Sequence, residues 1–331
     1  MSERFTAAVV QHPPVFLDRE RSLDRAADLV GEAVGAGASL VAFGETWLPG
    51  YPAWVFGSAG WDDPAAKRVF ARYQENAVEV PGPATRALGE LARAHGVHLV
   101  MGCTERDATF SRGTLYNSLL FFGPDGDLLG VHRKLVPTHA ERLVWGQGDG
   151  SGLRVYETAV GRLGGLVCWE HWMPLTRFAL HALGEQVHVA AWPEGPDIHH
   201  LASRHYAFEG RCYVLCAASY LSLADLPADF ELREVLGEAG DFGQADDVVI
   251  PGGSGIIGPD STWVAGPLVG EAGIVYGEID LGRIAQEQLA LDSAGHYNRP
   301  DIFDLSVDRR PRAHARFLEP DGPTGRDAPL A

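Results

Sequence analysis

Residues 163–177 read LGGLVCWEHWMPLTR, and this stretch decides the fold. Its apolar residues 163–167 predict a buried strand that ends at Cys168, and Pro174 then stands where a helix begins, because proline is tolerated in a first helical turn. A cysteine at such a strand-to-helix elbow is presented to a ligand, and the neighbouring backbone N–H groups can point toward an oxyanion. A buried structural cysteine is the alternative interpretation of the same pattern.

The rest of the chain alternates strands and helices around this stretch. Apolar runs predict strands at residues 7–11, 39–44, 97–103, 116–122, 128–134, 153–158, 187–192 and 213–218. Helical periodicity predicts helices at residues 17–35, 63–78, 83–95, 174–184 and 202–211. Hairpin turns are expected at the two GPD sequences, residues 123–125 and 258–260, whose similar surroundings indicate two related halves. This order is typical of an α/β protein with mixed sheets.

Residues 1–305 are predicted to form one domain, because no linker divides them. Residues 306–331 contain Pro, Gly and alternating charges, which predicts an extended C-terminal tail. Residues 222–247 carry eight acidic residues and one arginine with little strand or helix signal. We therefore expect them to form a surface insertion or an interface segment, and neither this segment nor the tail is expected to have a core of its own.

Composition limits the classes of function. The chain has 331 residues, of which 46% are hydrophobic, and a net charge of −17, which makes nucleic acid an improbable partner. No run approaches the ~20 apolar residues that a membrane span needs, and the N-terminus does not resemble a signal peptide. Four cysteines without a paired spacing fit a reducing compartment. We therefore expect a cytoplasmic protein that binds neither membrane nor nucleic acid.

Three chemically reactive residues stand at the carboxyl ends of predicted strands: Glu45, Lys134 and Cys168. Because ligands bind beyond those ends in open α/β sheets, distant strands can deliver their side chains to one pocket. A cysteine nucleophile needs a base, and a carboxylate with a raised pKa can serve. Lys134 is one of only two lysines among 27 basic residues, and an ammonium there would stabilise an anionic intermediate. Taken singly, each residue also has a structural explanation, as a turn cap, a solvated charge or a core thiol.

Four stretches carry a resemblance to a known family: FGETWLPGYP from residue 43, HRKLVPTHAERLVWGQGDGS from 132, GGLVCWEHWMPL from 164, and AWPEGPDIHHLASRHYAFEGRCYVL from 191. They resemble the catalytic-motif regions of the nitrilase superfamily of carbon–nitrogen hydrolases, and the details resemble the nitrilase branch. The resemblance implies a four-layer αββα sandwich with mixed sheets. It also implies a triad of Glu45, Lys134 and Cys168, with Glu141 as a second glutamate of the site.

The reaction that the resemblance implies is hydrolysis of a small organic nitrile to a carboxylic acid and ammonia, through a thioimidate and a thioester on Cys168. Glu45 would take the thiol proton. Lys134, aided by the Trp169 N–H, would stabilise the charged intermediates, and Glu141 would hold Lys134 and help to position water. The thiol and the carboxylate supply nucleophile and base, so no metal or organic cofactor is expected. Members of the family assemble, which implies a homodimer or a larger homo-oligomer.

Aromatic residues near these motifs are expected to shape the substrate pocket, because pockets for small ligands are mostly apolar. Core packing is the alternative, and it carries equal weight for Trp54 and Trp172. As a group they favour an aryl, arylalkyl or alkyl nitrile. The candidates are Tyr51, Trp54, Trp145, Trp169, Trp172 and Trp192.

Other chemistries fit the sequence less well. His199, His200 and His205 lack an HExxH spacing, and the separation between the last two puts them on different helix faces, which disfavours a metal hydrolase. His171 follows Cys168 too closely to be the base of a papain-like pair and is interpreted as a pocket-wall or hydrogen-bonding residue. The sequence around Ser254 does not match GxSxG. A cyanide-hydrolysing enzyme, an aliphatic amidase of the same superfamily and an inactive binding protein remain alternatives.

Overall fold

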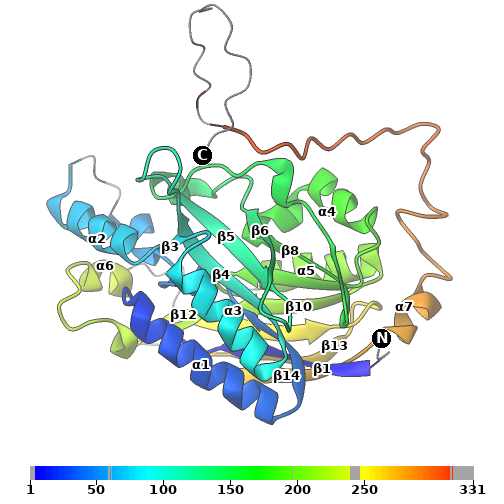
Figure 1. Ribbon diagram of the computed structural model, residues 1–331, viewed down its shortest axis with the longest axis horizontal. Coiled ribbons are helices and arrows are strands. Elements are labelled where there is room, and N and C mark those ends of the chain that lie inside the picture. Colours follow the sequence, from blue (N-terminus) through cyan, green and yellow to red (C-terminus); the bar gives the residue numbers. More distant parts are fainter. Residues whose placement is uncertain are drawn as a thin grey trace, which may run out of the picture.

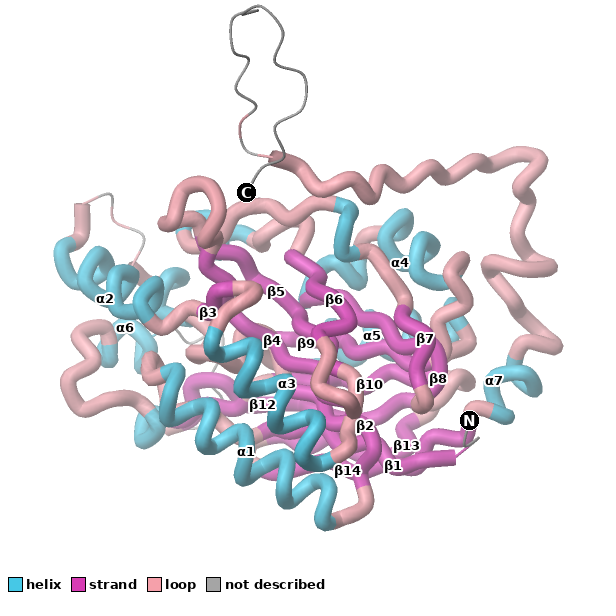
Figure 2. The backbone as a smooth tube through the Cα atoms, viewed as in Figure 1, coloured by secondary structure: helices cyan, strands magenta, loops and turns pink. Residues whose placement is uncertain are grey.

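The computed structural model describes residues 4–58, 60, 62–195, 197–238, 247–313 and 315. Within this part of the chain the strands form two seven-stranded sheets that pack face to face, with helices on their outer faces (Figures 1 and 2). In Figure 1, α1 and α3 lie side by side across the sheet that contains β4 and β5, and α4 lies near α5 on the opposite side of the molecule. The expected αββα sandwich with mixed sheets is confirmed.

The element bounds follow the alternation of the sequence. The strands are β1 (Arg4–Gln11), β2 (Ala38–Phe43), β3 (Val78–Glu79), β4 (His98–Arg106), β5 (Leu115–Phe122), β6 (Leu128–Arg133), β7 (Tyr156–Thr158), β8 (Gly161–Val167), β9 (Val187–Trp192), β10 (Tyr213–Ala218), β11 (Tyr220–Ser222), β12 (Val248–Ile257), β13 (Trp263–Val269) and β14 (Gly273–Asp280). The helices are α1 (Arg19–Gly35), α2 (Pro64–Glu75), α3 (Pro83–His95), α4 (Pro174–His181), α5 (Asp197–Gly210), α6 (Arg233–Glu238) and α7 (Gly282–Glu287).

The first sheet has the order β14-β1-β2-β4-β5-β6, with β3 beside β4. Successive side chains of a strand point to opposite faces of the sheet. In β1, Ala7 and Val9 face the core between the two sheets, whereas Ala8 and Val10 face the helices. Because both faces of the sheet are covered, its central strands are largely apolar, as expected for strands buried on both sides.

The second sheet, β11-β12-β10-β9-β8-β7 with β13 beside β12, repeats the plan of the first. In each sheet three neighbouring strands run parallel, β1-β2-β4 in one and β8-β9-β10 in the other. An antiparallel hairpin then follows, β5-β6 in the first sheet and β12-β13 in the second. The two predicted GPD turns connect these hairpins, so the indication of two related halves agrees with the topology.

Several predicted elements differ from the structure. Helix α5 begins five residues before the predicted start, and residues 273–280 and 282–287, to which no element was assigned, form β14 and α7. Strand β14 pairs with β1 along its whole length, although most of its residues are only half-buried. Such an edge strand lacks the continuous apolar run by which the central strands were predicted.

The described part of the acidic segment has more secondary structure than its weak strand and helix signal indicated, and it packs against the rest of the protein. Residues 223–225 form a short 3₁₀ turn, and α6 follows. Phe230, Leu232 and Leu236 are buried in a cluster that also contains Trp54 and Tyr73. Among the described acidic residues of the segment, Asp229, Glu231, Glu234 and Asp247 are exposed, so these charges lie on the outside of a packed element. Residues 239–246 lie outside the described residues.

The described start of the predicted tail, residues 306–313, contains neither helix nor strand. The backbone N–H of Arg312 donates to Asp149 Oδ2 at 2.8 Å, which anchors this stretch to the body of the protein. Residues 316–331 of the predicted tail lie outside the described residues.

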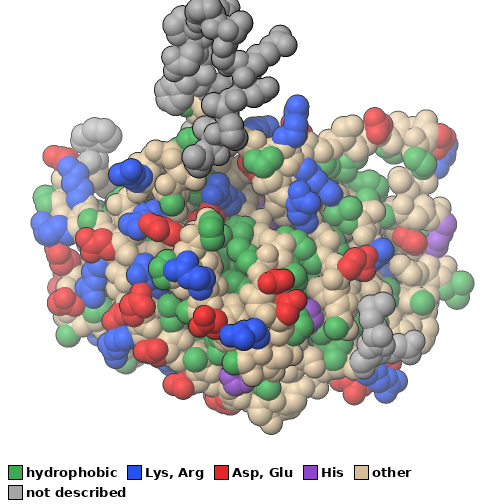
Figure 3. Space-filling model, viewed as in Figure 1, with side chains coloured by type: hydrophobic (Ala, Val, Ile, Leu, Met, Phe, Trp, Pro, Cys, Tyr) green, Lys and Arg blue, Asp and Glu red, His purple; other side chains and the backbone are tan. Residues whose placement is uncertain are grey.

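The surface mixes charges of both signs. On the face shown in Figure 3, acidic and basic side chains alternate around apolar side chains. Among the helices that the structure describes, none has the length and apolar composition needed to cross a membrane.

A close approach of two glycines fixes the end of β2, just before Glu45. A Cβ atom at Gly102 on β4 would overlap the carbonyl oxygen of Gly44 and lie 2.9 Å from the backbone nitrogen of Thr46. The N–H of Leu48 also donates to Gly102 O at 3.1 Å. Glycine at position 102 therefore allows the segment that carries Glu45 to lie directly on β4.

We expect Gly102→Ala to lower the free energy of unfolding by about 1–3 kcal/mol, the usual cost of overpacking. Gly35→Ala is the control, because a Cβ there meets nothing within 4 Å in α1, and alanine is favoured over glycine in a helix by about 0.5–1 kcal/mol. Urea unfolding of both variants measures the difference. Equal stability of the two variants would show that β4 and the Glu45 segment adjust without strain.

Candidate active site

Three strand ends deliver the reactive residues predicted from the sequence. Cys168 directly follows β8, Lys134 directly follows β6, and Glu45 comes two residues after β2. The hydrogen bond from Glu45 N to Trp192 O (3.3 Å) joins the end of β2 to the end of β9 in the other sheet. The site therefore lies between the two sheets, at the edge where their parallel strands end.

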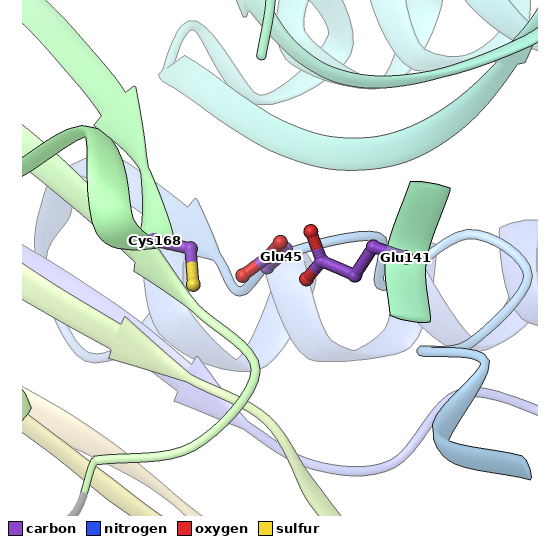
Figure 4. A group of neighbouring side chains, drawn as sticks. All are labelled: Glu45, Glu141 and Cys168. Carbon is purple, nitrogen blue, oxygen red and sulfur yellow. The ribbon is translucent and has the colours of Figure 1, made fainter. Parts of the chain in front are cut away.

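The side chain of Lys134 connects the two buried glutamates. Its Nζ donates to Glu45 Oε1 at 2.9 Å and to Glu141 Oε2 at 2.6 Å. Carboxylate oxygens of both glutamates and the sulfur of Cys168 all lie within 4.8 Å of one another. In Figure 4, Glu45 lies between Cys168 and Glu141. The structure thus brings together Glu45, Lys134, Glu141 and Cys168.

Glu45 has one occupied and one open carboxylate oxygen. Oε1 accepts from Lys134 and from the Asn117 amide at 2.5 Å. Within the described residues, Oε2 is buried and has no hydrogen-bond partner. Burial raises the pKa of Glu45 to about 7, although Lys134 opposes the rise. This carboxylate can therefore accept a proton near neutral pH.

Glu141 is held by three donors. Besides Lys134, the Tyr51 hydroxyl donates to its Oε1 at 2.8 Å, and the backbone N–H of Thr138 donates to its Oε2 at 2.6 Å. Lys134 remains charged, because Cys168 and the two glutamates raise its pKa well above the usual value against the effect of burial. Glu141 is thus held in one position, from which it orients the ammonium.

Cys168 occupies a tight elbow, as the sequence predicted. It begins a short 3₁₀ helix, Cys168–Trp172, with φ of 54°, in the left-handed region that non-glycine residues seldom adopt. Burial raises the pKa of its thiol well above the ordinary value, and the carboxylate of Glu45 adds to the rise. The resting side chain is therefore a neutral thiol beside a carboxylate that can take its proton.

A cavity of about 840 Å³ opens onto Cys168 and Glu141. Phe56, Met173 and Ile198 give it apolar walls. Its volume lies within the ~300–1,000 Å³ typical of small-molecule sites. The reactive residues therefore stand at the wall of a space that can hold a small, largely apolar molecule.

The six aromatic candidates occupy different positions. Tyr51 and Trp169 line the cavity, and Trp145 packs against Tyr51 with ring centroids 5.9 Å apart. Trp192 is stacked between two histidines behind the cavity wall. Trp54 is buried and lines a separate cavity. Trp172 is 37% exposed and is not among the cavity-lining residues.

Two residues of the site were missed by the sequence analysis. Asn117 lies next to Ser118 in the largely apolar strand β5. A buried amide needs a partner, but the sequence does not show which residue that partner is. Glu170 is buried and accepts from the N–H groups of Val167 and Leu135, both at 2.8 Å, and bonds to His132 Nε2 at 2.8 Å. Burial would raise the pKa of Glu170, but these partners lower it. Glu170 thereby ties the nucleophile turn to the segment after Lys134.

The carboxylates and the thiol of the site lie close enough together to bind a metal ion, but the Lys134 ammonium already lies between the carboxylates. Glu45, Glu141 and Cys168 could each offer a ligand atom, and the Lys134 ammonium bonds to both carboxylates. The histidines of α5 have separate roles: His199 accepts from Trp169 Nε1 at 3.2 Å, and His200 donates to Gly253 O at 2.7 Å. This arrangement favours a site that binds an organic substrate beside a fixed ammonium over a site that binds a metal ion.

Comparison with known proteins agrees with this arrangement. A family model for carbon–nitrogen hydrolases matches residues 6–287. The chain is 42% identical over 318 residues to a nitrilase 2 from an unknown prokaryotic organism, covering 96% of each chain. It is 39% identical over 316 residues to nitrilase 2 of Arabidopsis thaliana, covering 94% of this chain and 91% of that protein. The fold resembles the crystal structure of Saccharomyces cerevisiae Nit3, a member of branch 10 of the nitrilase superfamily, with a TM-score of 0.69 and 21% identity over 90% of this chain and 98% of that one.

The two lysines of the chain provide a matched test of the buried charge cluster. We expect Lys134→Met to lower the free energy of unfolding at pH 8 by about 3–5 kcal/mol, because two buried carboxylates lose their counter-charge. Lys67→Met removes an exposed ion pair with Asp62 and should cost less than about 1 kcal/mol. Urea unfolding at pH 8 measures both values, and similar losses for the two variants would contradict a buried ion cluster.

Proposed function

The chain belongs to the carbon–nitrogen hydrolase family, and we propose that its reaction is the hydrolysis of a small organic nitrile to a carboxylic acid and ammonia. One observation carries this proposal: the chain aligns over nearly its whole length with curated nitrilases at about 40% identity. The geometry supports it, because Glu45 and Lys134 lie beside Glu141 and Cys168, which line one cavity. The protein is therefore a hydrolase whose nucleophile is a cysteine rather than a serine.

The first half of the reaction uses the thiol and the open carboxylate oxygen. Glu45 takes the proton of Cys168 as the sulfur attacks the nitrile carbon, and the nitrile nitrogen receives a proton to give a thioimidate. The unbonded Glu45 Oε2 supports this role, because a general base needs a free acceptor near the proton it removes. Lys134 and the Trp169 N–H stabilise the negative charge that develops on nitrogen.

In the second half, two water molecules are consumed. The first adds to the thioimidate carbon, the C–N bond breaks and ammonia leaves, which produces a thioester on Cys168. The second hydrolyses the thioester, which releases the carboxylic acid and restores the thiol. Glu141 holds Lys134 and helps to position the water, a role supported by its three fixed donors. If the tetrahedral intermediate expels the thiol instead of ammonia, an amide forms as a side product.

The cavity supports an aryl, arylalkyl or alkyl nitrile as substrate. Tyr51, Phe56 and Trp169 surround the entrance to the reacting groups with aromatic rings, and Met173 and Ile198 extend the apolar wall. A nitrile bound there exchanges water for apolar contacts on most of its surface. This side-chain chemistry favours such substrates over hydrogen cyanide, which would leave most of the cavity unfilled.

The remaining expectations are part of the same proposal. We propose one catalytic domain of residues 1–305 with an extended tail, residues 306–331, and a homodimer or larger assembly in the cytoplasm. The described cysteines are all free, as in a reducing compartment. Leu175, Leu201 and Phe208 are exposed on α4 and α5, and we propose them as the contact surface between subunits. They are better candidates than the acidic segment, because the apolar residues around α6 are already packed within the protein.

Ammonia release from a panel of aryl and alkyl nitriles, the matching amides and cyanide tests the reaction. We expect nitriles with an apolar side group to be hydrolysed fastest, and Cys168→Ala to lose turnover entirely while unfolding at the same urea concentration as the wild type. Turnover of amides alone would assign the protein to the amidases, and turnover of cyanide alone to the cyanide-hydrolysing enzymes. Activity of Cys168→Ala would remove the nucleophile assignment.

The pKa of Glu45 determines the acid side of the activity profile. A general base must be ionised, and burial raises the pKa of Glu45 to about 7. Over the range from pH 5 to 8, we therefore expect kcat/KM to be highest between pH 7 and 8 and to fall about tenfold per unit as the pH decreases below 7. Initial rates from pH 5 to 8 measure this, with unfolding followed over the same range. A constant kcat/KM down to pH 5 in a folded enzyme would exclude Glu45 as the base.

A further inference from the structure

A row of buried polar side chains extends behind the nucleophile, on the side away from the substrate cavity. His171 Nδ1 lies 2.7 Å from Cys168 O, and His171 Nε2 lies 2.9 Å from His188 Nε2. His188 Nδ1 then lies 2.8 Å from Glu185 Oε1, and the Tyr206 hydroxyl donates to Glu185 Oε2 at 2.6 Å. All these side chains are buried. The reaction mechanism uses none of them.

The chemistry of the partners fixes the direction of each hydrogen bond. The carbonyl of Cys168 only accepts, so His171 Nδ1 donates to it, and Nε2 of a neutral His171 must accept. His188 Nε2 therefore donates to His171, and Nδ1 of a neutral His188 accepts in turn. The proton of that last bond has to come from Glu185, which is thus a carboxylic acid in this row.

The ionisation of the groups agrees with this order. Burial lowers the pKa of both His171 and His188 well below the usual value, so both rings are neutral at pH 7. Burial raises the pKa of Glu185 to about 8, although Tyr206 and His181 oppose the rise. The row of hydrogen bonds therefore runs in one direction, from Tyr206 to the carbonyl of Cys168.

The row ends at the backbone of an unusual turn. Cys168 has φ of 54°, and the orientation of its carbonyl sets where the following Trp169 N–H points. His171 is further held by stacking on Trp192, with ring centroids 4.8 Å apart. Glu170 holds the turn from its other side through the N–H of Val167. The left-handed elbow is thus fixed by two independent sets of buried groups.

We propose that His171, His188 and Glu185 are positioning residues that hold the Cys168 turn in its reactive conformation, and that the row works only while Glu185 carries its proton. An ionised Glu185 can only accept hydrogen bonds. The neutral His188 must then carry its proton on Nδ1, where it donates to Glu185, and not on Nε2. The Nε2 lone pairs of His188 and His171 then face each other, and the bond between them is lost. This proposal rests on the proposed role of Cys168 as the nucleophile.

A second cavity lies beside residue 185, apart from the one that opens onto Cys168. It has a volume of about 470 Å³ and is also lined by Arg162, His181 and Gln186. The side chain of Glu185 is itself fully buried, against His188.

Of the titratable groups in this part of the protein, Glu185 is the one that we expect to lose its proton near pH 8. It is faced by His188 from β9, His181 from α4 and Tyr206 from α5. The groups beyond them are Arg162, paired with Glu157, together with Glu209 and Cys212. Burial raises the pKa of Tyr206 and Cys212 well above their usual values, and Glu209 has its pKa lowered to about 2 despite burial by bonding to His181 and Arg177.

Glu185→Gln tests the ionisation step, because the glutamine amide donates to His188, its carbonyl accepts from Tyr206, and it has no proton to lose. We expect wild-type kcat/KM to fall about tenfold per pH unit above pH 8, and kcat/KM of Glu185→Gln to equal that of the wild type at pH 7.5 and stay level to pH 9.5. The control Glu157→Gln, at an exposed ion pair on β7, should show the wild-type profile.

Two variants at residue 171 test the positioning role. The amide nitrogen of asparagine can take the place of His171 Nδ1, so His171→Asn should keep kcat within about threefold of the wild type and lose the alkaline fall. His171→Leu has no donor and should lower kcat about ten- to a hundredfold with little change in KM. Urea unfolding identifies any variant that is merely unstable.

A readout independent of nitrile turnover is the rate of iodoacetamide alkylation of Cys168, measured by peptide mass spectrometry. The ratio of the Glu185→Gln rate to the wild-type rate should stay near one below pH 7.5 and depart severalfold from one at pH 9.5. Unchanged ratios and identical kcat/KM profiles would overturn the proposal, as would equal activity of His171→Leu and His171→Asn. Absent nitrile turnover with a changing alkylation ratio would reject the proposed function alone.

Discussion

The bonds from the Lys134 ammonium to Glu45 and Glu141 are the constraint on which the site depends. Three charged groups are buried within hydrogen-bond distance, and such burial is tolerated only when each charge is paired and its remaining hydrogen-bonding atoms find partners. Asn117, Tyr51 and the N–H of Thr138 supply those partners. One oxygen of Glu45 is left over, beside Cys168. This open carboxylate oxygen next to a thiol is what makes the group of buried charges chemically useful.

The two halves of the fold contribute unequal parts to that cluster. The first sheet supplies the charges, because Glu45 follows β2 and Lys134 follows β6. The second sheet supplies the nucleophile on an elbow after β8, together with the histidines and Glu185 behind it. Each sheet has the same arrangement of three parallel strands and a hairpin, so both present their strand ends at one edge. The charges and the thiol can therefore be held by separate sets of neighbours.

The reactive residues could be predicted from the sequence because they end apolar runs, and the fold class followed from the same alternation. Lys134 was further marked by the scarcity of lysine. The sequence could not show which aromatic residues line the cavity and which pack in the core. Trp169 lines the cavity and Trp54 is buried away from it, and only the direction of the side chain decides between the two. Asn117 and Glu185 gave no pattern, because a single polar residue acquires meaning only when its partner from another element is known. The acidic segment was misjudged because its charges outnumber the few apolar residues that pack.

The pairing of β1 with β14 has a consequence for how the chain is made. Arg4 lies opposite Asp280, so β1 leaves the ribosome long before β14, the strand that covers its outer edge. The other edge of β1 can pair with β2 early, whereas the outer edge keeps its N–H and C=O groups free until β14 is made. Exposed strand edges invite pairing between nascent chains, and contacts between distant segments form slowly. The first sheet is therefore completed only after all strands of the second sheet have been made, even though the strand that completes it carries none of the chemistry.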